Sequence, residues 1–260
     1  MNQEKPLILV TNDDGITADG LHALTEVVRP LGEVVVVAPE SSQSGMGHAI
    51  TIHDPLRLEK VGFKSPNLYY KSSGTPADCV KLAVDQVLDR KPDLLLSGIN
   101  HGPNSSVNVF YSGTLSAATE GSIMGIPSIG LSLNTYEPGA DFTAASHYAR
   151  ILAERFLKAH GNEGLLLNVN IPYAAREAIK GIKVCRQARA RYIEEFDKRT
   201  DPRGVDYYWL TGRLVNGDEE EDTDEWALKN QYVSLVPLSL DLTDHKKLDV
   251  LNALTSNASN

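Results

Sequence analysis

The feature that most constrains the fold of this chain is a short apolar segment near the N-terminus that ends in two adjacent acids. Leu7 to Val10 are four consecutive apolar residues, two of them β-branched, a pattern typical of a strand buried on both faces of a sheet. The segment ends in Asn12-Asp13-Asp14-Gly15. In an open parallel sheet, ligands bind at the carboxyl ends of the strands. Asp13 and Asp14 are therefore candidate ligand-binding residues.

Two adjacent carboxylates stay charged at low cost only where a cation or another positive group offsets them. The cation that such oxygen ligands favour is a hard one, Mg²⁺ or Mn²⁺. The alternative is a turn in which both acids cap the helix that follows. This stretch alone supports the two interpretations equally.

Strand and helix patterns alternate through the first two thirds of the chain. Apolar runs predict strands near residues 7–10, 34–38, 94–96, 128–133 and 165–170, and helical spacing predicts helices between them. Thr75-Pro76-Ala77-Asp78 has the composition of a helix start with a capping box. The alternation predicts an α/β fold built on a doubly wound, mostly parallel sheet.

Polar side chains follow the predicted strands at the points where the strands end. Ser44 and Gly45 lie in the loop after the second strand, and Asn100 lies at the end of a later one. The carboxyl ends of parallel strands share one edge of the sheet. Asp13, Asp14, Ser44 and Asn100 could therefore hold one hard cation with coordination positions left open. Serine-glycine loops are common, so Ser44 alone is weak evidence.

A helix that begins near Ser112 is a candidate anion site. Small and hydroxyl-bearing residues open this helix, as Ser112-Gly113-Thr114, and free amides at a helix N-terminus bind phosphate groups. The alternative is ordinary capping combined with tight helix packing through Ala117 and Ala118. Both interpretations remain open on the residues alone.

Composition excludes several classes of protein. The net charge of −9 argues against a nucleic-acid binder, which needs a basic face. Hydrophobic residues make up 42% of the chain, enough for a sizeable core, and two cysteines imply no disulfide framework. No apolar run approaches the length of a membrane span, and the N-terminus leads into the first strand without a signal-peptide pattern. We expect a cytoplasmic protein with no membrane partner.

The alternation stops near residue 182. Arginines and aromatic residues crowd the next segment, which we interpret as a hairpin arm. We interpret the acidic residues 217–225 as a solvated loop before a turn at Trp226, and the alternative is a second metal site. A strand over 231–240 contains Pro237, which favours an edge or a bend, and the last dozen residues resemble a fraying tail. We therefore divide the chain into a core, 1–181, and a C-terminal extension of the same domain, 182–260, expected to mediate oligomerisation.

Several blocks, in this order, resemble the SurE survival-protein nucleotidases. The blocks are Asn12-Asp13-Asp14-Gly15, Ala38-Pro39 with Ser44-Gly45, Gly74-Thr75-Pro76-Ala77-Asp78-Cys79, Ser97-Gly98-Ile99-Asn100 with Gly102 and Asn104, and Tyr111-Ser112-Gly113-Thr114. The resemblance extends over nearly the whole chain, through Asp241-Leu242-Thr243-Asp244-His245. The ordered set is specific, whereas any one block is not.

The resemblance implies a Rossmann-like fold whose C-terminal hairpin is exchanged between subunits of a homodimer or homotetramer. It implies a phosphomonoesterase that hydrolyses nucleoside monophosphates with one divalent cation, Mg²⁺ or Mn²⁺, per subunit. The activity would be that of a 5′-nucleotidase, with 3′-nucleotidase and exopolyphosphatase activities as extensions.

Site residues follow from the same resemblance. Asp13, Asp14, Ser44 and Asn100 match the metal ligands, and one of the two aspartates would orient or deprotonate the attacking water. The residues that match the phosphate-binding region are Gly45, Asn104, Ser112, Gly113 and Thr114.

Two other functions fit parts of the pattern. Phosphatases that form an aspartyl-phosphate resemble Asp-x-Asp after the first strand, but here the acids are adjacent. A non-catalytic nucleotide or metal sensor would use the same sheet edge. The dense set of oxygen ligands favours catalysis, because a binder does not need an open metal site.

Overall fold

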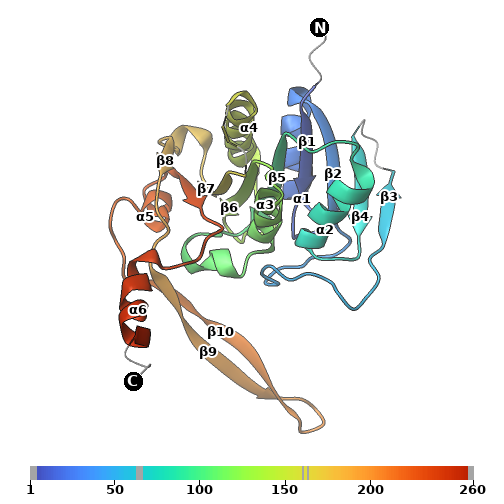
Figure 1. The fold of residues 1–260 in the computed structure, drawn as a ribbon. Helices are drawn as coiled ribbons and strands as arrows, with labels where there is room; N and C mark the ends of the chain where they lie inside the picture. The colour runs from blue at the N-terminus through green and yellow to red at the C-terminus, as the bar shows by residue number, and fades with distance from the viewer. Residues whose placement is uncertain (1–4, 63–66, 160, 163, 257–260) are drawn as a thin grey trace.

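The computed structural model describes residues 5–62, 67–159, 161–162 and 164–256 (Figure 1). Within these residues a nine-stranded sheet runs in the order β3-β4-β2-β1-β5-β6-β7-β11-β8. Its strands are β1 (Leu7–Thr11), β2 (Glu33–Pro39), β3 (Leu58–Val61), β4 (Leu68–Ser72), β5 (Leu94–His101), β6 (Ser128–Asn134), β7 (Leu166–Pro172), β8 (Ile182–Val184) and β11 (Val233–Leu238). The helices are α1 (Asp19–Val28), α2 (Pro76–Leu82), α3 (Gly113–Ile123), α4 (Thr143–Lys158), α5 (Asp224–Lys229) and α6 (Leu248–Ser256).

Helices cover both faces of this sheet (Figure 1). Ile8 and Val10 of β1 pack on the side of α1 and α4, whereas Leu7 and Leu9 pack on the side of α2 and α3. The side chains of a strand alternate between faces, so one apolar run serves two cores. β4, β2, β1, β5, β6 and β7 are mutually parallel. These observations confirm the doubly wound α/β fold.

The strand order reverses between β1 and β5. From β1 the chain builds outward through β2 and β4 on one side and through β5, β6 and β7 on the other. Ile8 to Thr11 pair with Leu94 to Ser97 across this junction. Ligands of open α/β sheets bind in the crevice at such a switch point. The residues that follow β1 and those that end β5 lie at this crevice.

The predicted capping box at the start of α2 is present. The Asp78 amide donates to Thr75 Oγ1 at 3.2 Å, and the Thr75 amide donates to Asp78 Oδ2 at 2.9 Å. The same two side chains hold the loop that follows β2, since Thr75 Oγ1 donates to the Ala49 carbonyl and Thr51 Oγ1 donates to Asp78. This cap therefore also anchors the far end of the loop that carries Ser44 and Gly45.

The C-terminal extension both joins the core sheet and projects from it. β11 is antiparallel to β7, and β8 is parallel to β11. Pro237 pairs with β7 beyond the end of β8, where its missing amide hydrogen removes no ladder bond. The predicted hairpin is formed by β9 (Ala190–Thr200) and β10 (Asp206–Asn216), which extend away from the body (Figure 1).

The prediction of a fraying C-terminal tail is wrong for residues 249–256, which belong to α6. Leu248, Leu251 and Leu254 recur at helical spacing, a signal that the polar ending obscured. Residues 257–260 lie outside the described part of the chain. In the described ranges, no helix is both long and apolar enough to cross a membrane.

The acidic segment before α5 is not wholly solvated. Thr223 caps α5 by accepting from the Trp226 amide at 3.2 Å, so the predicted turn is present. Asp224, however, is fully buried, and its carboxylate accepts hydrogen bonds from the amides of Ser106 (2.8 Å) and Ala188 (2.9 Å). This acid joins the base of the hairpin to the loop after β5.

Candidate active site

Asp13 and Asp14 lie in a tight turn at the end of β1. The Asn12 side chain closes this turn by donating to the Gly15 carbonyl (3.0 Å) and accepting from the Gly15 amide (3.2 Å). Asp13 is buried, and Asp14 is half-buried. Asp14 Oδ2 accepts a hydrogen bond from the His101 amide at 3.2 Å, which ties the end of β1 to the end of β5.

The first turn of α3 is packed directly against Asp13. Thr114 Oγ1 donates a hydrogen bond to Asp13 Oδ1. A Cβ atom on Gly113 would lie 2.6 Å from Asp13 Cβ and 2.9 Å from Asp13 Oδ2, so the helix can approach this closely only with glycine there. Ser112 caps the helix, since its Oγ accepts from the Leu115 amide at 3.1 Å.

These elements surround a pocket of about 320 Å³. Six of the residues singled out from the sequence line it: Asp13, Ser44, Gly45, Asn100, Asn104 and Ser112. Asp14, Gly113 and Thr114 are not among the lining residues. Gly113 and Thr114 instead support Asp13 from behind.

Sequence reasoning gave no role to five other lining residues: His101, Pro103, Asn108, Tyr111 and Tyr136. Asn108 and Tyr111 belong to the loop between Asn104 and Ser112, so their proximity to the site could have been inferred from the sequence. Tyr136 follows the end of β6 at the same sheet edge.

The loop that carries Ser44 and Gly45 is fixed on both sides of these residues. The Gln43 amide donates to the Asp13 carbonyl at 2.7 Å, and the Gly47 amide donates to the Tyr111 carbonyl at 3.1 Å. His48 Nε2 lies 3.0 Å from Glu120 Oε2, so the histidine has a structural partner. These contacts hold Ser44 beside the aspartates although Ser44 itself is exposed.

Two asparagines at the end of β5 have different surroundings. The side-chain Nδ2 of Asn100 donates to the Gly102 carbonyl at 2.6 Å, which leaves the side-chain oxygen of Asn100 available as a ligand. Asn104 belongs to a buried network: its main-chain amide donates to Asn170 at 2.7 Å, and its side chain donates to Ser132 at 2.9 Å. The network fixes the loop that forms one wall of the pocket.

The electrostatics of the aspartates match the chemistry of a cation site. Burial raises the pKa of Asp13 to about 6; the Thr114 hydrogen bond opposes this rise, and the nearby Asp14 adds to it. Burial also raises the pKa of Asp14, opposed by the His101 amide. Within the described ranges no lysine or arginine forms an ion pair with either acid. Hard oxygen donors without a positive partner are the environment that Mg²⁺ or Mn²⁺ fits.

The raised pKa of Asp13 predicts how the stability of the metal-free protein depends on pH. A rise from 3.8 to about 6 means that the folded state binds the proton more tightly, so stability falls as pH rises from about 4 to 6, by about 3 kcal/mol. In EDTA, Asp13→Asn should therefore be more stable than the wild type at pH 7.5, with the difference vanishing near pH 4. Urea unfolding at a series of pH values measures this; a pH-independent difference would contradict it.

Comparison with known proteins identifies the family. The family model of survival protein SurE matches residues 8–194. The chain belongs to the SurE family. It is 57% identical to the 5′-nucleotidase SurE of Christiangramia forsetii over 99% of this chain and 100% of that protein. The protein of the same name from Flavobacterium johnsoniae is 55% identical over 97% and 98% of the two chains.

A solved structure agrees with this assignment to the SurE family. The crystal structure of the SurE protein from Aquifex aeolicus matches with a TM-score of 0.83 at 42% sequence identity. The match covers 96% of this chain and 100% of that one. The structural similarity therefore extends over the C-terminal extension, including residues beyond those matched by the family model.

Proposed function

We propose that this protein hydrolyses nucleoside monophosphates to a nucleoside and inorganic phosphate in a reaction that requires a divalent cation. The observation that carries the proposal is the packing of the α3 N-terminus against Asp13, in one pocket with oxygen donors from three other loops. Relatives named 5′-nucleotidase SurE, at 55–57% identity over nearly the full chain, support the hydrolysis of nucleotides.

Asp13, Asp14, Ser44 and Asn100 are the residues that would hold the cation. They offer two carboxylates, a hydroxyl and an amide oxygen, all of them hard donors. Bound there, Mg²⁺ or Mn²⁺ would polarise a phosphate oxygen and lower the pKa of a bound water. Burial raises the pKa values of both acids, and this supports the proposal that a cation offsets their charge.

The other residues would bind and orient the phosphate group. Ser112, the N-cap of α3, lines the pocket, and amides at a helix N-terminus, which lack intrahelical partners, would stabilise negative charge on phosphate oxygens there. Gly45 and Asn104 border the same space. Thr114 holds Asp13 in place through its hydroxyl. One of the two aspartates orients the attacking water or accepts its proton.

Phosphate release from a panel of 5′- and 3′-nucleoside monophosphates and tripolyphosphate tests this function. Each is assayed with EDTA and then with added Mg²⁺ or Mn²⁺. We expect release only with the metal. Equal release in EDTA would contradict the metal requirement. Binding of nucleotides without any turnover would replace the hydrolase with a sensor, and a trapped phosphoenzyme would replace it with an aspartyl-phosphate mechanism.

We further propose that the β9–β10 hairpin mediates assembly into a homodimer or homotetramer. Phe196 and Leu210 are paired across the hairpin and are 66% and 67% exposed, and an isolated two-stranded hairpin is at best marginally stable. Light scattering should show an oligomer for the wild type and a smaller species for Phe196→Asp combined with Leu210→Asp. Asp206→Asn, also on the hairpin, is the control. A monomeric wild type would contradict this proposal.

A further inference from the structure

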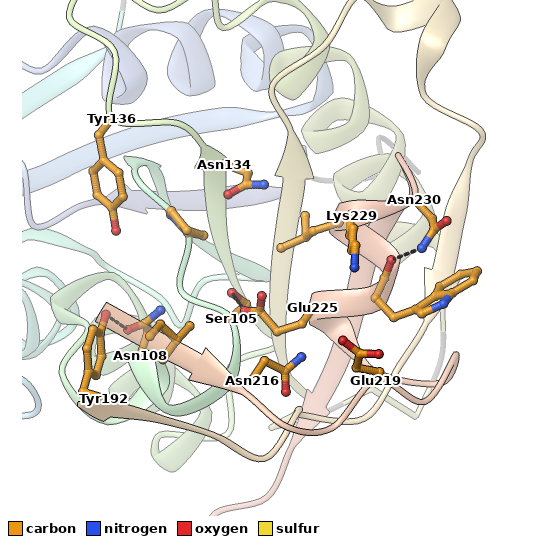
Figure 2. Close-up of a pocket in the computed structure, with 14 residues that line it drawn as sticks. Ser105, Asn108, Asn134, Tyr136, Tyr192, Asn216, Glu219, Glu225, Lys229 and Asn230 are labelled. Carbon is orange, nitrogen blue, oxygen red and sulfur yellow. Dashed lines mark hydrogen bonds between the residues drawn. The ribbon is translucent and has the colours of Figure 1, made fainter. Parts of the chain in front are cut away.

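A second, larger pocket adjoins the candidate active site (Figure 2). Its volume is about 840 Å³, and it shares Pro103, Asn108 and Tyr136 with the pocket that contains Asp13. A phosphate group is far too small to require this additional space. The two pockets together suit a substrate with a phosphate at one end and a larger group at the other.

Tyr136 gives the second pocket a fixed aromatic wall. Its ring lies on the backbone of Gly102: a Cβ atom there would be 2.3 Å from Tyr136 Cε1. Gly102 also has a φ of +117°, which favours glycine. Tyr136 is nevertheless 71% exposed. An aromatic ring held from behind and open in front is a platform on which a planar group can stack.

Tyr192 stands at the opposite side of the opening and comes from the base of the hairpin. Its hydroxyl donates to Asn108 Oδ1 at 2.7 Å, and its ring meets the Tyr111 ring edge-on at 6.5 Å between centroids. Figure 2 shows the hydroxyl ends of Tyr136 and Tyr192 directed toward each other across the pocket. The core and the extension thus each supply one aromatic side of the opening.

The interior of this pocket is polar but not basic. Asn134, at the end of β6, lines the pocket, and Figure 2 shows its side chain between Tyr136 and Lys229. Among the described residues that line it, Glu219 and Glu225 are the acids and Lys229 is the single cation. Glu225 accepts a hydrogen bond from Ser105 Oγ at 2.5 Å. Two acids against one lysine disfavour a second phosphate. A neutral, planar group with hydrogen-bonding edges fits better.

We propose that this pocket binds the nucleoside half of the substrate, with the base stacked on Tyr136 and its polar edge facing Asn134. The phosphate then lies at Asp13 and Ser112, and the sugar lies between, at Pro103 and Asn108, which the two pockets share. This assignment rests on the proposed function. It adds a substrate-binding role for Tyr136 and Asn134 and a role for the C-terminal extension in selecting the substrate.

The test compares two phosphate esters in one assay. Adenosine 5′-monophosphate carries a base, whereas glycerol 2-phosphate does not. We expect Tyr136→Ala to lower the kcat/KM for adenosine 5′-monophosphate, relative to that for glycerol 2-phosphate, by at least about ten-fold. The change should come mainly through KM for the nucleotide, because stacking on an aromatic side chain contributes strongly to binding. Tyr136→Phe keeps the ring and should keep the ratio within about two-fold of the wild type. Tyr173→Ala, which removes an exposed tyrosine outside both pockets, is the matched control.

Calorimetric titration with adenosine measures the affinity of the pocket for a nucleoside in the absence of any hydrolysis. We expect the wild type to bind adenosine and Tyr136→Ala to bind it at least about ten-fold more weakly. An equal loss of activity on both esters, or equal adenosine affinity in the two proteins, would overturn the nucleoside pocket. If the wild type binds adenosine in a Tyr136-dependent way but releases no phosphate from any ester, the pocket is supported and the proposed hydrolysis fails.

Discussion

Replacing Asp14 with asparagine should lower phosphate release from nucleoside monophosphates by at least about 10²-fold, because a charged ligand for the cation is lost. The substitution is nearly isosteric, and the new amide oxygen can still accept the hydrogen bond that the His101 amide now donates to Asp14 at 3.2 Å. The turn should therefore survive. Initial rates with Mg²⁺ or Mn²⁺, and calorimetric titration with Mn²⁺ alone, measure the two consequences.

The free energy of unfolding of Asp14→Asn distinguishes the loss of a metal ligand from misfolding. Burial raises the pKa of Asp14, so its negative charge opposes folding when no metal is bound. Asp14→Asn should accordingly be at least as stable as the wild type in EDTA at pH 7.5. Asp54→Asn removes an exposed carboxylate elsewhere and should leave the rate and Mn²⁺ affinity unchanged. A wild-type rate and Mn²⁺ affinity in Asp14→Asn would refute the assignment of Asp14 as a ligand.

Gly113→Ala should abolish most activity through a single methyl group. That methyl group would lie 2.6 Å from Asp13 Cβ, a position close to the main chain from which Asp13 cannot rotate away. Either the start of α3 or Asp13 must shift, which disturbs the acid and the anion-binding amides together. We expect a fall in kcat/KM of about 10²-fold or more and a loss of about 1–3 kcal/mol in the free energy of unfolding.

A second glycine provides the matched control for this substitution. No atom of the described residues lies within 4 Å of a Cβ atom built on Gly62, so Gly62→Ala should retain activity and stability. Phosphate release and urea unfolding are measured on both variants. Full activity in Gly113→Ala would mean that α3 does not press against Asp13 in solution, and the anion-binding role of its first turn would have to be abandoned.

The core of the fold could be predicted because its signals are local. Continuous apolar runs marked β1, β2, β5, β6 and β7, and the capping box marked the start of α2. The rule that parallel strands present their carboxyl ends at one edge then brought Asp13, Ser44 and Asn100 together, as the structure places them. Their proximity follows from topology, whereas their role as metal ligands stays a prediction.

The second pocket could not be predicted in this way, because its walls come from segments that local patterns do not relate. Tyr192 lies on the hairpin and Glu225 on α5, and both reach the loop after β5 through contacts distant in sequence. The buried Asp224, which binds the amides of Ser106 and Ala188, is the clearest case. In the sequence it is one of a run of acids, and only its partners distinguish it from its solvated neighbours.

The position of Asp224 between the hairpin base and the loop after β5 has a consequence for how such an enzyme can diverge. The aspartates and the start of α3 lie within residues 13–114, whereas Tyr192, Glu219, Glu225 and Lys229 come from a later part of the chain. Mutations of Glu219 or Lys229 can reshape the larger pocket, whereas Asp224 has to stay, because its hydrogen bonds to the amides of Ser106 and Ala188 anchor the loop after β5. Selection can then favour new phosphate esters as substrates while Asp13, Asp14 and the start of α3 stay unchanged.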